Sequence, residues 1–143
     1  MRVTLAESDD DVRSCHAVMR QLRPHLDAEQ LVERVRGQRA EGYRLALLRD
    51  GDALVAVAGY RLGNNLAWGR FLYVDDLVTD SARRSQGSGQ HLLRWLIEAA
   101  RAAGCDELHL DSGVQRFGAH RFYLRSGMDI TSHHFCVRLD NGS

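Results

Sequence analysis

A phenol and two carboxylates lie close together in one apolar stretch of this sequence. Tyr73, Asp75 and Asp76 fall within residues 71–79, which are mostly β-branched, aromatic or aliphatic and predict a strand. Since side chains alternate along a strand, we expect Tyr73 and Asp75 on one face and Asp76 on the other, unless a bulge exchanges the two acids. Acids in mid-strand are unfavourable by propensity, which favours acid–base chemistry over a solvated patch or simple partners of nearby Arg residues.

A glycine-containing turn follows this strand and leads into a helix. Gly87 and Gly89 lie in the turn, and the apolar helical face begins at about Gly89. Such a turn forms an anion site, because the first N–H groups of a helix lack partners and the helix dipole adds positive charge there. A nucleotide P-loop would need a Lys after the second glycine, and the dinucleotide fingerprint would need glycine at Leu92. Neither motif is present.

Apolar periodicity and turn residues predict the elements that position this strand and turn. The predicted elements are strand 2–6, helix 10–22, helix 27–40, strand 43–48, strand 53–62, strand 71–79, helix 89–103, strand 105–111, helix 115–125 and strand 128–139. The order β-α-α-β-β-β-α-β-α-β predicts a single α/β domain over residues 1–143, with a mixed, mostly antiparallel sheet flanked by helices.

The composition excludes several classes of protein. The formal net charge is zero, with 19 basic and 19 acidic residues, which argues against a general nucleic-acid binder. No apolar run approaches the length of a membrane span, and the N-terminal residues lack the apolar segment of a signal peptide. The three cysteines have no Cys-x-x-Cys spacing, so we expect reduced, mostly buried thiols in a cytoplasmic protein.

Two motifs resemble those of the GNAT N-acetyltransferase superfamily. Residues 84–89, Arg-Ser-Gln-Gly-Ser-Gly, resemble its Arg/Gln-x-x-Gly-x-Gly/Ala motif. Residues 119–128, one strand and one helix later, resemble its Ala-x-x-Phe-Tyr-x-x-x-Gly-Phe pattern, with Met128 in place of the usual aromatic residue. The predicted order of elements is also that of the GNAT fold, so the resemblance covers nearly the whole chain.

The resemblance implies acetyl-coenzyme A as the acyl-donor cosubstrate. Its pyrophosphate would bind the N–H groups of residues 86–90, and its pantetheine arm would pair with the central strand as an added strand. Arg116 stands where the family often has a cofactor-contacting Asn, and its side chain would reach a phosphate instead. The cofactor-binding residues expected from the resemblance are Leu77, Val78, Thr79, Arg84, Ser85, Gln86, Gly87, Ser88, Gly89, Gln90 and Arg116.

The resemblance also implies roles for catalytic groups. The N–H of Leu77 would face the thioester oxygen. Asp75, with Tyr73 beside it, stands where several family members keep an acidic or His base, and Tyr123 is the candidate acid for the leaving thiolate. Asp76, His133 and His134 remain alternatives for the base, and Tyr123 is equally explained as a packing residue. The histidines lack the spacing and third ligand of a zinc site, so no metal is expected.

These residues predict an N-acetyltransferase that transfers an acetyl group from acetyl-coenzyme A to a primary amine of a small molecule or protein. Direct attack in a ternary complex is expected, because neither motif holds a Cys that could form an acyl-enzyme. The alternatives are a non-catalytic domain that senses coenzyme A or an acyl-coenzyme A, and a structural dimerising domain. A homodimer through the last strand is common in the family, while the sequence itself defines neither the oligomeric state nor the acceptor.

Overall fold

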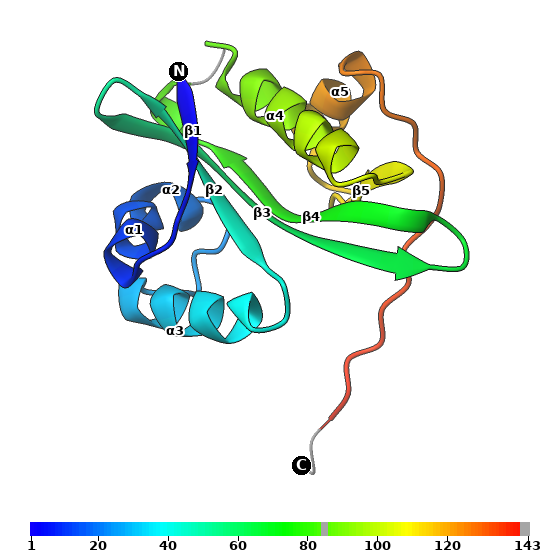
Figure 1. Ribbon diagram of the computed structural model, residues 1–143, viewed down its shortest axis with the longest axis horizontal. Helices are drawn as coiled ribbons and strands as arrows, with labels where there is room; N and C mark the ends of the chain where they lie inside the picture. Colours follow the sequence, from blue (N-terminus) through cyan, green and yellow to red (C-terminus); the bar gives the residue numbers. More distant parts are fainter. Residues whose placement is uncertain (84–85, 141–143) are drawn as a thin grey trace. The chain divides into compact units, whose positions relative to one another are not determined.

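The described part of the chain contains one five-stranded sheet (Figure 1). The structure, a computed structural model, describes residues 1–83 and 86–140. The strands are β1 Arg2–Leu5, β2 Arg44–Asp50, β3 Ala53–Asn65, β4 Gly69–Thr79 and β5 Glu107–Leu110. Their spatial order is β1-β2-β3-β4-β5, with antiparallel pairing up to β4 and parallel pairing of β5 with β4. The predicted α/β class with a mixed, mostly antiparallel sheet is confirmed.

These residues form two compact units, Met1–Leu110 and Asp111–Ser143. The first unit contains the sheet and four α-helices, and the second contains helix α5 and the C-terminal segment. No helix among the described residues is long and apolar enough to span a bilayer. No group of three or more His, Cys, Asp or Glu in the same residues is placed to hold a metal ion.

Helices α1, α2 and α3 cover one face of the sheet in the first unit (Figure 1). They span Asp9–Ser14, His16–Met19 and Ala28–Arg39, so the single helix predicted over residues 10–22 is broken at Cys15. Ser8 and Asp27 cap α1 and α3 through capping boxes, which fixes where these helices begin. The core between these helices and the sheet comprises Ala6, Val12, Cys15, Val18, Met19, Leu31, Val32, Val35, Tyr43, Leu45, Leu47 and Val57.

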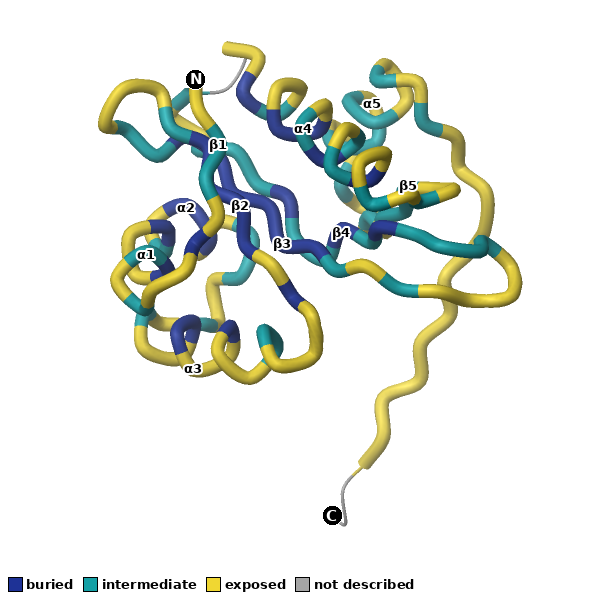
Figure 2. Tube along the Cα trace, viewed as in Figure 1, coloured by how far each residue is buried: buried dark blue, intermediate teal, exposed yellow. Residues whose placement is uncertain are grey.

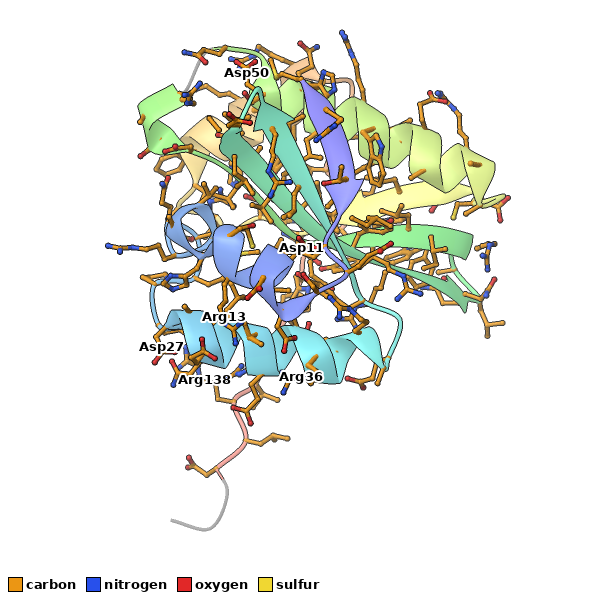
Figure 3. All side chains as sticks on the ribbon, turned by 60° about the vertical axis from the view of Figure 1, so that its left-hand side comes forward. Asp11, Arg13, Asp27, Arg36, Asp50 and Arg138 are labelled. Carbon is orange, nitrogen blue, oxygen red and sulfur yellow. The ribbon has the colours of Figure 1, made fainter. Side chains whose placement is uncertain are left out.

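Charged side chains join the outer surfaces of α1 and α3. Arg13 on α1 donates to Glu29 on α3 at 2.7 Å, and Arg36 on α3 donates to Asp9 on α1 at 2.6 Å. Figure 3 labels Arg13 and Arg36 on this helical layer, away from the sheet. Exposed pairs of this kind contribute roughly 0–1 kcal/mol each, so the buried apolar side chains, not these ions, hold the layer in place.

Helix α4, Ser88–Ala102, packs on the opposite face of the sheet (Figure 1). Its buried side chains recur at helical spacing, as Leu92, Leu93, Leu96 and Ala100. Trp95 meets Tyr60 of β3 edge-to-face, with ring centroids 5.9 Å apart. Figure 2 shows that burial concentrates along β2, β3 and the inner side of α4. The central strands are therefore packed between two layers of helices.

The second unit differs from the prediction after helix α5, Phe117–Arg125. Residues 128–139 were expected to form a last strand, but residues 128–140 contain no regular secondary structure, so that prediction is wrong. A strand needs a neighbour that accepts its main-chain hydrogen bonds, and this segment pairs with no strand in the described part of the chain. Its large apolar side chains are exposed: Ile130, Phe135, Val137 and Leu139. Cys136 is exposed for the same reason, whereas Cys15 is buried as expected.

Candidate functional site

Strand β4 carries a β-bulge at Asp75. Gly59 of β3 pairs with Asp76 and the next residue, Tyr60, pairs with Val74, so Asp75 has no residue opposite it. The extra residue breaks the alternation of side chains along the strand. As a result, the carboxylates of Asp75 and Asp76 both lie on the face covered by α1–α3, where they bind Arg61 and Arg23, respectively. The expectation that Asp76 would point to the opposite face from Asp75 is therefore wrong, and the bulge is the physical reason.

Both oxygens of Asp76 are engaged by protein groups. The Arg23 Nε donates to Asp76 Oδ1 at 2.8 Å, and the Tyr43 hydroxyl donates to Asp76 Oδ2 at 2.8 Å. Burial, together with the neighbouring Asp76 charge, raises the pKa of Tyr43 well above its ordinary value, so the phenol keeps its proton as a donor. A carboxylate with both oxygens already hydrogen-bonded positions its neighbours and is less available to a substrate than one with an unbonded oxygen.

One oxygen of the Asp75 carboxylate has no partner among the described residues. The Arg61 Nε donates to Asp75 Oδ2 at 2.8 Å, whereas Oδ1 makes no hydrogen bond within the described residues. Burial raises the pKa of Asp75 above its ordinary value, an effect that the hydrogen bond and charge of Arg61 oppose. A free carboxylate oxygen of increased basicity is suited to accept a proton from a substrate or a water.

Tyr73 lies beside this pair. It stands directly opposite Arg61 in the β3–β4 ladder and directly opposite His109 in the β4–β5 ladder. Paired residues project their side chains to the same face of a sheet, so Tyr73 shares a face with the arginine that holds Asp75. The structure thus brings together the three β4 residues that the sequence singled out.

The outer edge of β4 is open beyond Val74. Strand β5 pairs only with residues 71–74 of β4, and no other strand of the described chain covers residues 75–79 on that side. The Asp80 N–H donates to the Val55 carbonyl of β3 at 2.8 Å. By the alternation of antiparallel pairing, Val78 directs its main-chain groups toward β3, while Leu77 and Thr79 direct theirs toward the open edge. Two sets of main-chain donors and acceptors are thereby available to an extended ligand.

The N-terminus of α4 is uncapped in the part of the chain that the structure describes. Gly87 is the N-cap residue, with φ of 79°, and neither a side-chain cap nor an acid occupies the first turn. The first helical bond is donated by the His91 N–H to the Gly87 carbonyl, so the preceding N–H groups lack intrahelical partners. A Cβ at Gly87 would meet nothing within 4 Å, so glycine is needed there for its left-handed backbone. Arg84 and Ser85 lie outside the described residues.

The second unit brings Arg116 and Tyr123 together. Arg116 is the N-cap residue of α5, and its positive charge acts on the Tyr123 hydroxyl. Burial raises the pKa of Tyr123 above its ordinary value, and the charge of Arg116 opposes that change. The phenol is accordingly protonated at neutral pH. His133 and His134 belong to the same unit and are exposed, with His134 Nδ1 lying 3.3 Å from Asp111 Oδ1.

Sequence reasoning missed the groups that hold the two carboxylates, which are Arg23, Tyr43 and Arg61. Arg61 was detectable, because it is a charge placed in the otherwise apolar strand predicted over residues 53–62. Arg23 and Tyr43 adjoin the turn signals Pro24 and Gly42 and carry no local sign of their contacts with Asp76. Both residues lie more than thirty positions from Asp76 in the sequence, so their contacts with it arise only in the tertiary structure.

Comparison with known proteins gives concordant matches. The sequence profile of the acetyltransferase (GNAT) family matches residues 10–128. The chain is 35% identical over 130 residues to the uncharacterized N-acetyltransferase YhdJ of Bacillus subtilis, which covers 90% of this chain and 92% of that protein. It is 37% identical over 86 residues to the aminoalkylphosphonate N-acetyltransferase of Salmonella typhimurium, covering 59% of this chain and 54% of that enzyme.

The fold is shared with solved acetyltransferase structures. A putative acetyltransferase from Agrobacterium tumefaciens superposes with a TM-score of 0.83 at 23% identity, over 97% of this chain and all (100%) of that one. The profile match spans most of the sequence and includes the strand, the turn and the whole of the second motif. On these grounds the chain is an acyltransferase and a member of the acetyltransferase (GNAT) family.

Proposed function

We propose that this protein transfers an acetyl group from acetyl-coenzyme A to a primary amine by direct attack in a ternary complex. The observation that carries the proposal is that three features follow one another along the chain. Asp75 at the bulge of β4 has an oxygen without a partner among the described residues, the main-chain edge of β4 after it is open, and the N-terminus of α4 beyond it is uncapped. Each part matches one requirement of the reaction, namely a base, a site for an extended thioester arm and a site for phosphate.

Binding of the acyl donor is supported by the main chain. Leu77 and Thr79 present donors and acceptors to the open edge, which suits the amides of a pantetheine arm added as a strand. The uncapped N–H groups after Gly87 suit a pyrophosphate, since an anion there also gains from the helix dipole. The bound thioester supplies an activated acyl carbon, and the Leu77 N–H would donate to its carbonyl oxygen.

Proton transfer is assigned to side chains. Asp75 Oδ1 would accept the proton of the incoming ammonium, directly or through a water, while Arg61 holds Oδ2 and fixes the carboxylate. Asp76 is a poor candidate for the base because Arg23 and Tyr43 occupy both of its oxygens. Tyr123, protonated at neutral pH, would return a proton to the leaving thiolate.

A panel of acceptors tests this proposal. Acetyl-coenzyme A binding is measured by calorimetry, and thiol release is followed with ethanolamine, polyamines, amino acids, a lysine peptide and an aminoalkylphosphonate, the class named for the Salmonella relative. We expect binding and release of free thiol with at least one amine. Absence of binding at millimolar acetyl-coenzyme A, or binding without thiol release from any amine, would refute the proposed reaction.

A further inference from the structure

A cavity of about 240 Å³ adjoins Asp76 of β4. It lies between α2, the loop that follows it, α3 and Asp76, so it belongs to the first unit. Its floor is apolar and comprises Met19, Leu26, Leu31 and Val35. The volume is several times the ~30 Å³ that one water occupies in the liquid, so the cavity has room for a small organic molecule.

Two arginines and one carboxylate are the charged side chains that line this cavity, together with a histidine. Arg23, Arg34 and His25 line it, against Asp76 as the single carboxylate in the lining. Asp76 is already hydrogen-bonded to Arg23 and Tyr43. Arg34 and His25 form no hydrogen bond or ion pair within the described residues, although acids are plentiful elsewhere on α1 and α3. Arg23 also keeps its Nη1 group unengaged by any described residue.

The cavity is linked to the candidate base through two side chains. Gln38 lines the cavity and accepts a hydrogen bond from Arg61 Nη2 at 3.4 Å. Arg61 in turn donates through Nε to Asp75. Arg23 gives a second link, because its Nη2 donates to the Asp75 carbonyl at 3.1 Å. A molecule in this cavity consequently lies next to the groups that position Asp75.

We propose that the amine acceptor carries an oxyanion, a phosphoryl group or a carboxylate, which binds to Arg34 and His25 with Arg23 beside them. The inference rests on the proposed function for the role of Asp75. An ammonium compound without an anion would be repelled by the arginines of the cavity, whereas a zwitterion places its negative end on them and its amine toward Asp75. Guanidinium groups bind both oxyanions through paired N–H donors, and the apolar floor contacts the short carbon chain between the two ends.

Matched acceptors and three variants test the inference. Phosphoethanolamine and ethanolamine share the amine and both carbons and differ in the phosphate alone, and β-alanine supplies the carboxylate. Binding of each to the full chain is measured by NMR chemical-shift titration, and thiol release is measured in parallel. Arg34→Gln removes the unpaired cation, Arg34→Lys keeps a charge, and Arg36→Gln removes an exposed arginine of the same helix that pairs with Asp9.

We expect phosphoethanolamine to bind about 10- to 100-fold tighter than ethanolamine, the range for a few charge-assisted hydrogen bonds. Arg34→Gln should reduce that ratio severalfold through KM or Kd, Arg34→Lys should restore part of it, and Arg36→Gln should leave it unchanged. Equal affinity for the two compounds, or a ratio that Arg34→Gln does not alter, would overturn the inference. Selective binding of phosphoethanolamine without any thiol release would instead refute the transferase proposal and leave the anion site standing.

Discussion

Replacement of Asp75 by Asn separates a catalytic role from a structural one. The amide keeps the shape of the carboxylate and an oxygen that accepts the Arg61 N–H, but it cannot take a proton. General-base catalysis typically contributes ~10²–10⁴-fold, which corresponds to about 3–5 kcal/mol of activation free energy. We therefore expect kcat to fall by that factor in a thiol-release assay, while the Kd of acetyl-coenzyme A measured by calorimetry stays the same.

Asp75→Asn should leave the free energy of unfolding equal or higher, although it lowers kcat. Burial raises the pKa of Asp75 in the folded protein, so the ionised form is less favourable there than in the unfolded chain. The stability gained from the protonated form is present below the unfolded pKa, about 3.9, and is lost as pH rises through the higher folded pKa. At pH 7 the neutral Asn removes that penalty, so urea unfolding should give an equal or higher free energy of unfolding.

Asp76→Asn is the matched control for this variant. It removes the negative charge of the carboxylate that accepts hydrogen bonds from Arg23 and Tyr43. Hydrogen bonds to charged groups are worth roughly 1.5–3 kcal/mol. We expect a lower free energy of unfolding by that amount and a smaller loss of kcat than in Asp75→Asn. If Asp75→Asn retained wild-type kcat and its pH–rate profile, or if Asp76→Asn lost more activity, the assignment of the base would be refuted.

Three further variants address other parts of the site. Gly59→Ala places a Cβ against the Tyr43 hydroxyl and should lower the free energy of unfolding by about 1–3 kcal/mol in urea; unchanged stability would contradict that packing. Gly87→Ala forces a residue with a side chain to adopt φ of 79°, at a cost of roughly 1–2 kcal/mol. Calorimetry should then show weaker acetyl-coenzyme A binding, and unaltered affinity would contradict the proposal that this turn binds the pyrophosphate. Tyr123→Phe should reduce kcat by ~10²-fold without changing cofactor affinity, and an intact kcat removes Tyr123 from the acid role.

Local sequence signals were sufficient for most of the fold. The periodic apolar residues of α4, the Asp50–Gly51 hairpin and the capping residue Asp27 each act within a few positions, so their elements follow from neighbouring residues. The last predicted strand failed because the alternation of Phe135 and Val137 favours an extended chain but does not supply a pairing partner. Pairing is a long-range property, and a sequence pattern shows only one side of it.

The candidate site was predictable in its residue types but not in its geometry. The acids of β4 and the glycine turn were evident from composition and spacing. The bulge at Asp75 is a one-residue shift in the pairing of β3 with β4, and the residues of β4 alone do not reveal such a shift. The difference in hydrogen bonding between the Asp75 and Asp76 carboxylates likewise depends on residues of other segments, which are Arg23, Tyr43 and Arg61.

The most direct test of the central claim is residue-resolved amide hydrogen exchange with and without acetyl-coenzyme A. The proposal predicts new protection for the Leu77 and Thr79 N–H groups at the open edge and for the N–H groups of Ser88 to Gln90. The Val78 N–H, which faces β3, should already be protected in the free protein. Binding of acetyl-coenzyme A with no added protection at Leu77 and Thr79 would contradict the proposal that this edge of β4 holds the acyl donor.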